Sequence, residues 1–97
     1  MTTTLQLLHE KRDAIYEIAA RYGVKNIRVF GSVVRGEERP DSDVDMLIDI
    51  EQGRSLFDWV GFRQDCTELL GRETDAVLED SLYHMLREPI LREAQPL

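Results

Sequence analysis

Two aspartates, Asp43 and Asp45, are the strongest candidates for catalytic chemistry in this chain. They begin an apolar segment, residues 43–50, that has the composition of a β-strand. Successive side chains of a strand point to opposite faces, so both carboxylates lie on one side while Val44 points to the other. Carboxylate oxygens in this arrangement suit Mg²⁺ or Mn²⁺, which also bind waters and substrate phosphates. The pair therefore predicts a metal and phosphate site at one end of a strand.

A second feature of this kind is the dipeptide Gly31-Ser32, which a ten-residue spacer, 33–42, separates from Asp43. Because Gly31 has no side chain, backbone N–H groups can come close to a phosphate there. The Ser32 hydroxyl and the start of a short helix would add further donors and a favourable dipole. We expect this turn to bind the triphosphate tail of a nucleotide. A plain turn glycine followed by a helix cap is the alternative interpretation.

Transfer of a nucleotidyl group to a hydroxyl needs a further ligand, because such reactions commonly use two metal ions about 3.5–4 Å apart. Asp75 is the best candidate for a third carboxylate, since it lies early in the last predicted strand. A strand beside the one that carries Asp43 and Asp45 would bring Asp75 within reach. We therefore predict all three aspartates as metal ligands, with Asp75 activating the hydroxyl. A simple surface position is the alternative for Asp75.

The secondary structure that would carry these residues follows from hydrophobic periodicity and from capping and turn residues. The strand at 43–50 is apolar enough to lie inside a sheet, and Pro89 must kink or divide the last helix. The pattern predicts one α/β (α+β) domain over 1–97, with a small mixed sheet of about three strands packed against helices. The predicted order is a helix at 4–22, a strand at 27–30, a short helix at 32–35, a loop at 36–42, a strand at 43–50, a helix at 55–70, a strand at 74–79 and a helix at 81–94.

The composition describes a small globular protein of 97 residues, with 42% hydrophobic and 32% charged residues. Its formal net charge of −7 argues against DNA or RNA as the direct substrate and favours a basic protein partner. Cys66 is the only cysteine, so metal binding would depend on carboxylates rather than on a zinc cluster. No apolar run reaches the roughly 20 residues that span a bilayer, and no leader pattern is present at the start. We expect a cytoplasmic protein without membrane contact.

Taken together, these residues resemble the nucleotidyltransferase superfamily of DNA polymerase β, whose signature is Gly-Ser followed after a spacer by Asp-x-Asp. The resemblance is closest to the minimal nucleotidyltransferases, the antitoxin partners of HEPN ribonuclease toxins. It is carried by residues 31–37 and 41–47, by Leu70-Gly71-Arg72 before Asp75, and by the closing segment 90–94. The chain departs from the family at Thr74, where an apolar residue usually precedes the third aspartate. This departure leaves the strand register around Asp75 open.

The resemblance implies a specific reaction and a specific partner. It implies transfer of AMP, or another nucleoside monophosphate, to a protein hydroxyl, a tyrosine of a cognate HEPN toxin that is thereby silenced. It also implies Mg²⁺ (or Mn²⁺) at Asp43, Asp45 and Asp75, with ATP as nucleotide donor held at Gly31 and Ser32. Larger relatives add a second domain that holds the acceptor, so here we expect the partner itself to complete the site. A non-catalytic module that neutralises a toxin by direct contact is the alternative function.

Purely structural roles are the alternative interpretation of several residues. Asp43 and Asp45 are also compatible with a solvated strand end. A segment that begins at Asp41 resembles an EF-hand loop, but it has Met46 and Gln52 where such a loop needs glycine and glutamate.

The sequence also predicts the surroundings of four further side chains. Asp49 shares a face with Asp45 but lies further along, and we expect it to be exposed to solvent. Arg35 and Arg39 could either neutralise phosphate or pair with nearby acids. Cys66 lies on the apolar stripe of its helix and is expected in the core.

Overall fold

The computed structural model describes residues 3–37, 39, 42–82 and 84–97. Helices and strands follow one another in nearly the predicted order. The last predicted helix is replaced by a short 3₁₀ turn and a shorter helix, and a strand that was not predicted ends the chain. The elements are α1 (Thr4–Glu10), α2 (Arg12–Tyr22), β1 (Val24–Phe30), α3 (Ser32–Arg35), β2 (Val44–Ile50), α4 (Leu56–Leu70), β3 (Thr74–Leu78), η1 (Glu79–Ser81), α5 (His84–Glu93) and β4 (Gln95–Pro96).

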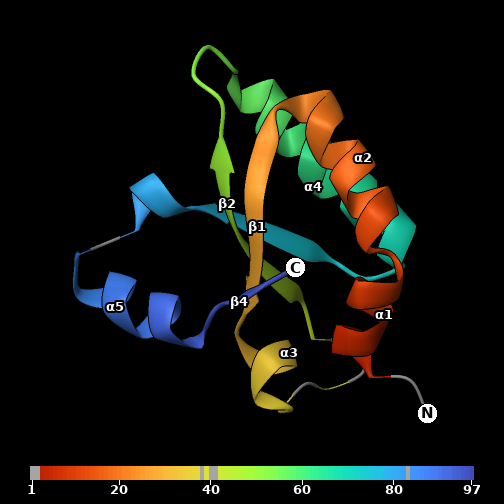
Figure 1. Cartoon of the computed structure of the whole chain (residues 1–97), viewed down its shortest axis with the longest axis vertical. Coiled ribbons are helices and arrows are strands. Elements are labelled where there is room, and N and C mark those ends of the chain that lie inside the picture. The colour runs from red at the N-terminus through yellow and green to blue at the C-terminus, as the bar shows by residue number, and fades with distance from the viewer. Residues whose placement is uncertain (1–2, 38, 40–41, 83) are drawn as a thin grey trace.

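The four strands form one mixed sheet in the order β3-β2-β1-β4 (Figure 1). Strand β1 is antiparallel to both β2 and β4, whereas β2 and β3 are parallel. The prediction of a mixed sheet with 43–50 as an interior strand is confirmed. The short strand β4 was not predicted, because two residues that include Pro96 carry no local strand signal. It forms where the chain returns to pair with Arg28 and Val29 of β1.

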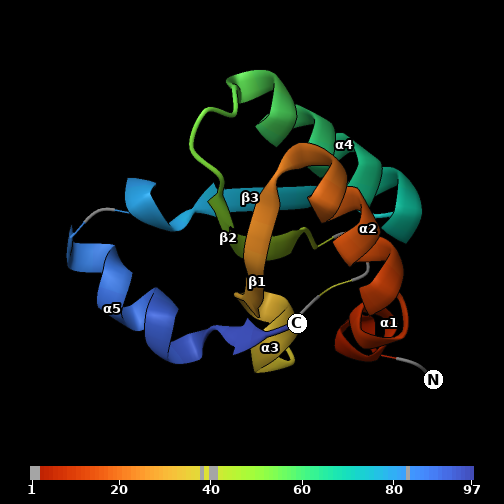
Figure 2. The same ribbon diagram turned by 45° about the horizontal axis from the view of Figure 1, so that its top comes forward.

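Helices α2 and α4 lie side by side on one face of the sheet, whereas α5 lies toward the other (Figures 1 and 2). The alternation predicted for β2 is present, since Val44, Met46 and Ile48 are completely buried on the side that faces the core. The core also includes the predicted Cys66. Its buried members are Leu8, Ile15, Ile18, Ala19, Val24, Ile27, Val29, Val33, Val44, Met46, Ile48, Phe62, Cys66, Leu70, Ala76 and Leu97.

The first predicted helix, 4–22, is interrupted at Lys11, whose backbone angles of φ −97° and ψ 12° separate α1 from α2. The predicted capping box is present, because the Thr3 hydroxyl accepts from the Gln6 N–H at 3.1 Å while the Gln6 side chain accepts from the Thr3 N–H at 2.8 Å. Gly23 ends α2 in the left-handed conformation that was expected of it. Helical periodicity alone did not indicate the break.

Strand β1 begins at Val24, three residues before the predicted strand. Its early part is irregular, because Asn26 has a positive φ of 53° and the register with β2 shifts between Lys25 and Arg28. The polar residues in this irregular part hid the start of the strand from a pattern based on alternation. The strand at 74–79 ends one residue early, at Leu78.

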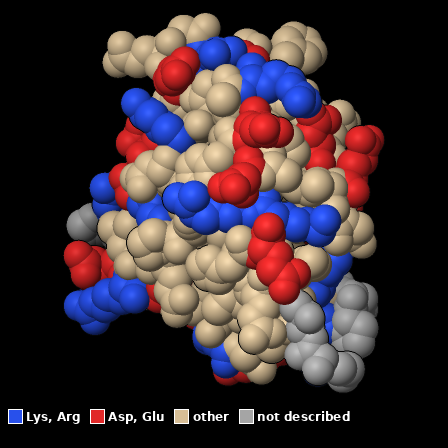
Figure 3. Space-filling model, turned by 45° about the vertical axis from the view of Figure 1, so that its right-hand side comes forward, with Lys and Arg blue, Asp and Glu red and all other residues tan. Residues whose placement is uncertain are grey.

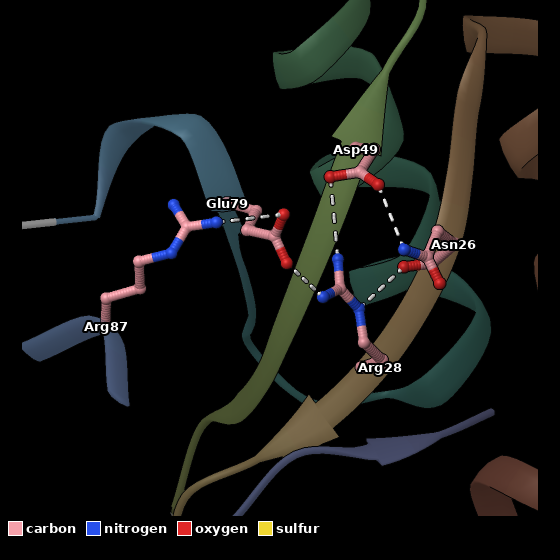
Figure 4. A network of polar contacts seen from close by, with 5 residues as sticks. All are labelled: Asn26, Arg28, Asp49, Glu79 and Arg87. Carbon is pink, nitrogen blue, oxygen red and sulfur yellow. Dashed lines mark hydrogen bonds and ion pairs between the residues drawn. The ribbon is translucent and has the colours of Figure 1, made fainter. Parts of the chain in front are cut away.

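A network of charged side chains on the open face of the sheet attaches η1 and α5 to β1 and β2 (Figure 4). Arg28, with only 11% of its side chain exposed, donates to Glu79 at 2.5 Å and lies 3.5 Å from Asp49. Asn26 also donates to Asp49 at 3.0 Å, and Arg87 of α5 lies 3.7 Å from Glu79. The expectation that Asp49 is simply solvated is therefore wrong, because β1 places a cation and an amide beside it.

The predicted helix at 81–94 becomes η1 followed by α5, which spans His84–Glu93 with Pro89 inside it. Pro89 does not divide the helix. Among the residues that the structure describes, no helix has the length and apolar character needed to cross a membrane.

Candidate active site

The turn after β1 brings the Gly31-Ser32 dipeptide directly against the Asp43/Asp45 strand. Gly31 has φ 83° and ψ −154°, a conformation that favours glycine. A Cβ atom at this position would collide with the carboxylate of Asp45. Glycine is thus required both by its backbone angles and by the close approach of Asp45. The Gly31 carbonyl accepts from the N–H groups of Val34 and Arg35 at 3.1 Å each, which starts the single turn α3 at Ser32.

The aspartates that were predicted to act together lie on neighbouring strands. In the parallel ladder between β2 and β3, Asp45 is the register partner of Asp75. In the antiparallel ladder on the other side, Asp45 lies opposite Phe30, the residue that precedes Gly31. Asp43 immediately precedes β2, which begins one residue later than predicted, and its side chain is exposed. Asp41, which belongs to the segment quoted for the family resemblance, lies outside the described residues.

Thr74 keeps the register around Asp75 in spite of being polar. It is the partner of Val44 and is 1% exposed, so its side chain takes the buried position that an apolar residue would fill. Its hydroxyl donates to the Arg72 carbonyl at 3.2 Å, and its N–H donates to the Thr67 hydroxyl at 3.0 Å. Because these polar groups are satisfied, the departure at Thr74 does not displace Asp75.

Negative charge is concentrated around Asp45. Burial raises the pKa of its carboxyl above the usual value, and the charges of Asp75, Asp43 and Glu93 raise it further, while Arg35 opposes them. Ionised carboxylates gathered in this way repel one another unless a cation joins them. The donor chemistry therefore fits a hard divalent cation such as Mg²⁺ or Mn²⁺.

Asp75 is engaged elsewhere in this structure. Its carboxylate lies 3.3 Å from the guanidinium of Arg63 in α4, which also lies over the ring of Trp59 at 4.8 Å from its centre. In the part of the chain that the structure describes, no three His, Cys, Asp or Glu side chains are grouped closely enough to enclose a metal ion. The remaining ligands of a cation would come from substrate phosphates and water. Sequence patterns carried no signal for Arg63.

The loop before Asp43 is held by Arg72, the residue that follows Gly71. Its guanidinium donates to the carbonyls of Ser42 at 2.5 Å and Arg39 at 3.1 Å, and it also contacts Thr4 of α1. The Arg39 N–H donates to the Ser42 hydroxyl at 2.7 Å. These contacts connect the approach to Asp43 with the start of β3, where Asp75 lies.

Arg35 pairs with nearby acids. Its guanidinium donates to Glu93 at 2.6 Å and to Glu37 at 3.1 Å, and the hydrogen bond with Glu93 is the main reason that the pKa of Arg35 is raised. The other oxygen of Glu93 accepts from the Gly31 N–H at 3.2 Å. Residue-level reasoning from the sequence missed Glu93, because its partners are about 60 positions away.

Two hollows flank the edge strand β3. One, of about 360 Å³, has mainly apolar walls and reaches Asp75. Its lining residues are Leu56, Trp59, Asp75, Ala76, Val77, Leu78 and Ser81. A larger one, of about 500 Å³, lies between α4 and the start of β3, and none of the three aspartates lines it. Of these two hollows, the smaller one is therefore next to a predicted metal ligand, Asp75.

Cys66 is no part of this site. It is completely buried, and burial raises the pKa of its thiol to about 12, so it is not a nucleophile at neutral pH.

Comparison with known proteins agrees with this geometry. Residues 11–97 match the profile of the family described as nucleotidyltransferase domain. The chain belongs to this family. It is 43% identical over 77 residues to the protein adenylyltransferase MntA of Thermococcus cleftensis, an alignment that covers 79% of this chain and 78% of the relative.

Solved structures of the family share the fold. A structure described as a minimal nucleotidyltransferase is 46% identical and superposes with a TM-score of 0.85, covering 96% of this chain and 95% of the other. A chain in a complex of the tri-AMPylated Shewanella oneidensis HEPN toxin with an MNT antitoxin has a TM-score of 0.67 over 91% of this chain and 69% of that one. Its identity of 14% shows likeness of fold alone. The predicted resemblance to minimal nucleotidyltransferases and the predicted fold class are thus confirmed, and the protein is a nucleotidyltransferase that uses a nucleoside triphosphate and a divalent metal.

Proposed function

We propose that this nucleotidyltransferase transfers AMP from ATP to a tyrosine hydroxyl of a HEPN ribonuclease toxin and acts as its antitoxin in the cytoplasm. The observation that carries the proposal is the meeting of the Gly31 turn with Asp45 and its register partner Asp75. The name of the 43% identical relative, a protein adenylyltransferase, supports the reaction. The AMPylated HEPN toxin in the complex with a related fold supports the choice of acceptor.

In the proposed site, one group of residues binds the metal and another binds the nucleotide. Asp43, Asp45 and Asp75 would hold Mg²⁺ or Mn²⁺, and Gly31 and Ser32 would hold the triphosphate. The metal, when bound, neutralises charge on the phosphates and lowers the barrier to attack. The raised pKa of Asp45 is consistent with a carboxylate that gains a cation on substrate binding.

The reaction is an in-line displacement at the α-phosphorus. The tyrosine oxygen forms a new bond to that phosphorus, the bond to the bridging oxygen breaks, and pyrophosphate leaves. The proton of the hydroxyl passes toward Asp75, which activates the acceptor. Asp75 must first exchange its contact with Arg63, 3.3 Å away, for this role. Binding of the acceptor and of the nucleotide therefore completes a site that the free chain holds only in part.

The acceptor is proposed to approach through the apolar hollow beside β3. This hollow has a volume of about 360 Å³, and Asp75 lies on its wall together with Leu56 and Trp59. An aromatic ring fits apolar walls, and a tyrosine presents its hydroxyl at the far end of that ring. Because β3 is an edge strand, a partner protein can reach the hollow without displacing another element.

The test is a transfer assay with the purified chain, the HEPN toxin encoded by the adjacent gene, labelled ATP and Mg²⁺. We expect label and the mass of AMP on the toxin. Asp43→Asn, Asp45→Asn and Asp75→Asn should each slow transfer by about 10²-fold or more, because each removes a ligand from the site. Asp13→Asn makes the same charge change at a fully exposed position of α2 and should leave the rate unchanged.

Two outcomes would contradict the proposal. A toxin that stays unmodified but is still silenced would favour the alternative, a module that neutralises by direct contact. Transfer of AMP at the wild-type rate by the Asp45→Asn variant would show that the carboxylates do not bind the catalytic metal.

A further inference from the structure

The C-terminal segment places one acidic side chain, Glu93, against the turn that is proposed to hold the nucleotide. We propose that Glu93 is a positioning residue for nucleotide binding, which holds Gly31 and Arg35 in the arrangement that receives the triphosphate. This inference rests on the proposed function of the Gly31 turn and adds a residue to it. The supporting observations are the register of β4, the two contacts of Glu93 and the shortness of α3.

The register of the sheet sets the position of Glu93. Strand β4 pairs with β1 so that Pro96 lies opposite Arg28 and Gln95 opposite Val29. Glu93 is the last residue of α5 and lies two residues before β4, so this pairing brings it close to the end of β1, where the Gly31 turn begins. The end of the chain is secured as well, since the Leu97 N–H donates to the Ile27 carbonyl at 3.0 Å. The backbone pairing thus brings Glu93 near the turn, and its side chain then contacts Gly31 and Arg35.

The carboxylate of Glu93 holds the turn at two points. One oxygen accepts from the Gly31 N–H at 3.2 Å, and the other accepts from the Arg35 guanidinium at 2.6 Å. These two residues flank the helix α3, at its N-cap and at its last residue. The side chain of Glu93 is 22% exposed and that of Arg35 is 48% exposed, so water screens this ion pair only in part.

Such support matters because α3 has only four residues. A single helical turn is not stable by itself, since the conformational entropy lost in forming it exceeds the gain from its hydrogen bonds. Its orientation therefore depends on contacts from outside. Glu93 supplies two of them and leaves the Ser32 hydroxyl for the ligand. It also keeps the Arg35 guanidinium beside the turn.

The test measures ATP binding directly, by isothermal titration with Mg²⁺ present, at a temperature where every variant is folded. Glu93→Ala should raise the dissociation constant of ATP by about tenfold, because both contacts to the turn are lost. Glu88→Ala is the matched control. Glu88 lies on the same helix, is 73% exposed and pairs only with Arg92 among the contacts described, so ATP binding should change by less than about twofold.

A double-mutant cycle shows whether Glu93 acts through Arg35. In an Arg35→Ala background, Glu93→Ala should weaken ATP binding less than it does in the wild-type background, because one of its two contacts is already absent. Glu93→Gln keeps an oxygen for the Gly31 N–H but loses the charge opposite Arg35, and it should fall between the wild type and Glu93→Ala. This variant also keeps the test decisive if Glu93→Ala does not fold.

The outcomes separate this inference from the proposed function. If the wild-type chain binds ATP and both Glu93 variants bind it equally well, Glu93 has no positioning role and only this inference fails. Tighter binding by the variants would also overturn it, since Glu93 would then compete with phosphate for the turn. If the wild-type chain binds no ATP with Mg²⁺ even when the toxin is present, the nucleotide site itself is wrong, and both proposals fall.

Discussion

At the scale of single residues, Asp45 is the point where the site comes together. It is the register partner of Asp75 on one side and of Phe30 on the other, and a Cβ atom at position 31 would displace its carboxylate. Its position in an interior strand removes much of its hydration, which raises its pKa. A carboxylate that has lost hydration in this way contributes to function but lowers the stability of the free protein.

The first prediction concerns the loss of stability that comes from burying the Asp45 carboxylate. A raised pKa means that the folded protein binds the Asp45 proton more tightly than the unfolded chain does. Stability therefore falls as the pH rises from the usual carboxyl value through the raised one, and the penalty persists at neutral pH. Asp45→Asn removes the charge, so the melting temperature at pH 7 should rise by a few degrees while transfer of AMP slows by about 10²-fold or more.

This is measured by thermal unfolding of both proteins between pH 4 and pH 8. The difference between them should be small at the acid end and grow with pH. Asp13→Asn, at an exposed position, should follow the wild type throughout. A variant that melts below the wild type at pH 7 would show that Asp45 stabilises the fold instead.

At the scale of elements, the site depends on strands that bring side chains together and on a helix that ends beside them. Strand β2 presents apolar side chains to α2 and α4 on one face, and the carboxylates of Asp45 and Asp49 with the buried Leu47 on the other. Helix α5 crosses toward the open face, where Arg28 and Glu79 attach the segment before it (Figure 4). It then delivers Glu93 to the Gly31 turn. The weak point of this helix is Pro89, which lacks the N–H needed for a helical hydrogen bond.

The second prediction follows from that weakness. Pro89→Ala should restore the hydrogen bond to the carbonyl of Met85, one turn earlier, and should make α5 more stable. Interior proline costs about 3 kcal/mol in a helix, but α5 is largely exposed, so we expect a gain of about 1 kcal/mol in the free energy of unfolding. Urea unfolding measures the gain in the free energy of unfolding of the whole protein. Hydrogen exchange of the α5 amides shows whether this gain comes from α5.

Pro96→Ala is the matched control for this change. Pro96 lies in β4 and not in a helix, so its replacement should give no comparable gain. If Pro89→Ala leaves the amides of α5 as weakly protected as before, the helix is limited by something other than the proline.

At the scale of the whole molecule, the charged surface and the free sheet edge indicate how a partner binds. Acidic and basic side chains alternate on the face in Figure 3, without a broad basic area of the kind that binds nucleic acid. Strand β3 is an edge of the sheet and adjoins the apolar hollow that reaches Asp75. Leu56, on the wall of this hollow, is 70% exposed although it is a large apolar residue. An exposed residue of this type beside a reaction centre favours contact with a protein acceptor.

The third prediction tests that surface. Leu56→Ser should raise the KM for the protein acceptor by about five- to tenfold, because burial of a leucine on binding is lost. The dissociation constant of ATP should stay unchanged, since Leu56 begins α4 after the end of β2, whereas the Gly31 turn lies beside Asp45 at the start of β2. Met85→Ser is the control, because Met85 is 84% exposed on α5 and does not line the hollow. Equal losses in the two variants would mean that the acceptor does not bind at the hollow.

Features that depend on neighbours along the chain could be predicted from the amino-acid sequence. Strand side chains alternate as a result of backbone geometry, so the spacing alone separates Asp43 and Asp45 from the core face. Glycine at the turn, the helix caps and most of the order of the elements are equally local, and they were predicted with small errors at their ends, whereas η1 and β4 were missed. The break at Lys11 was missed because helical periodicity continues through it.

Features that depend on pairing between distant segments emerge only when the chain is folded. The register that sets Asp45 beside Asp75, the strand β4 that sets Glu93 beside Gly31, and the Arg63 contact to Asp75 all join residues that are far apart in the chain. The expectation that Asp49 is exposed to solvent was wrong for the same reason, since its partner Arg28 comes from another strand. Register is selected by the burial of whole strand faces, a property of the packed sheet that no single segment contains.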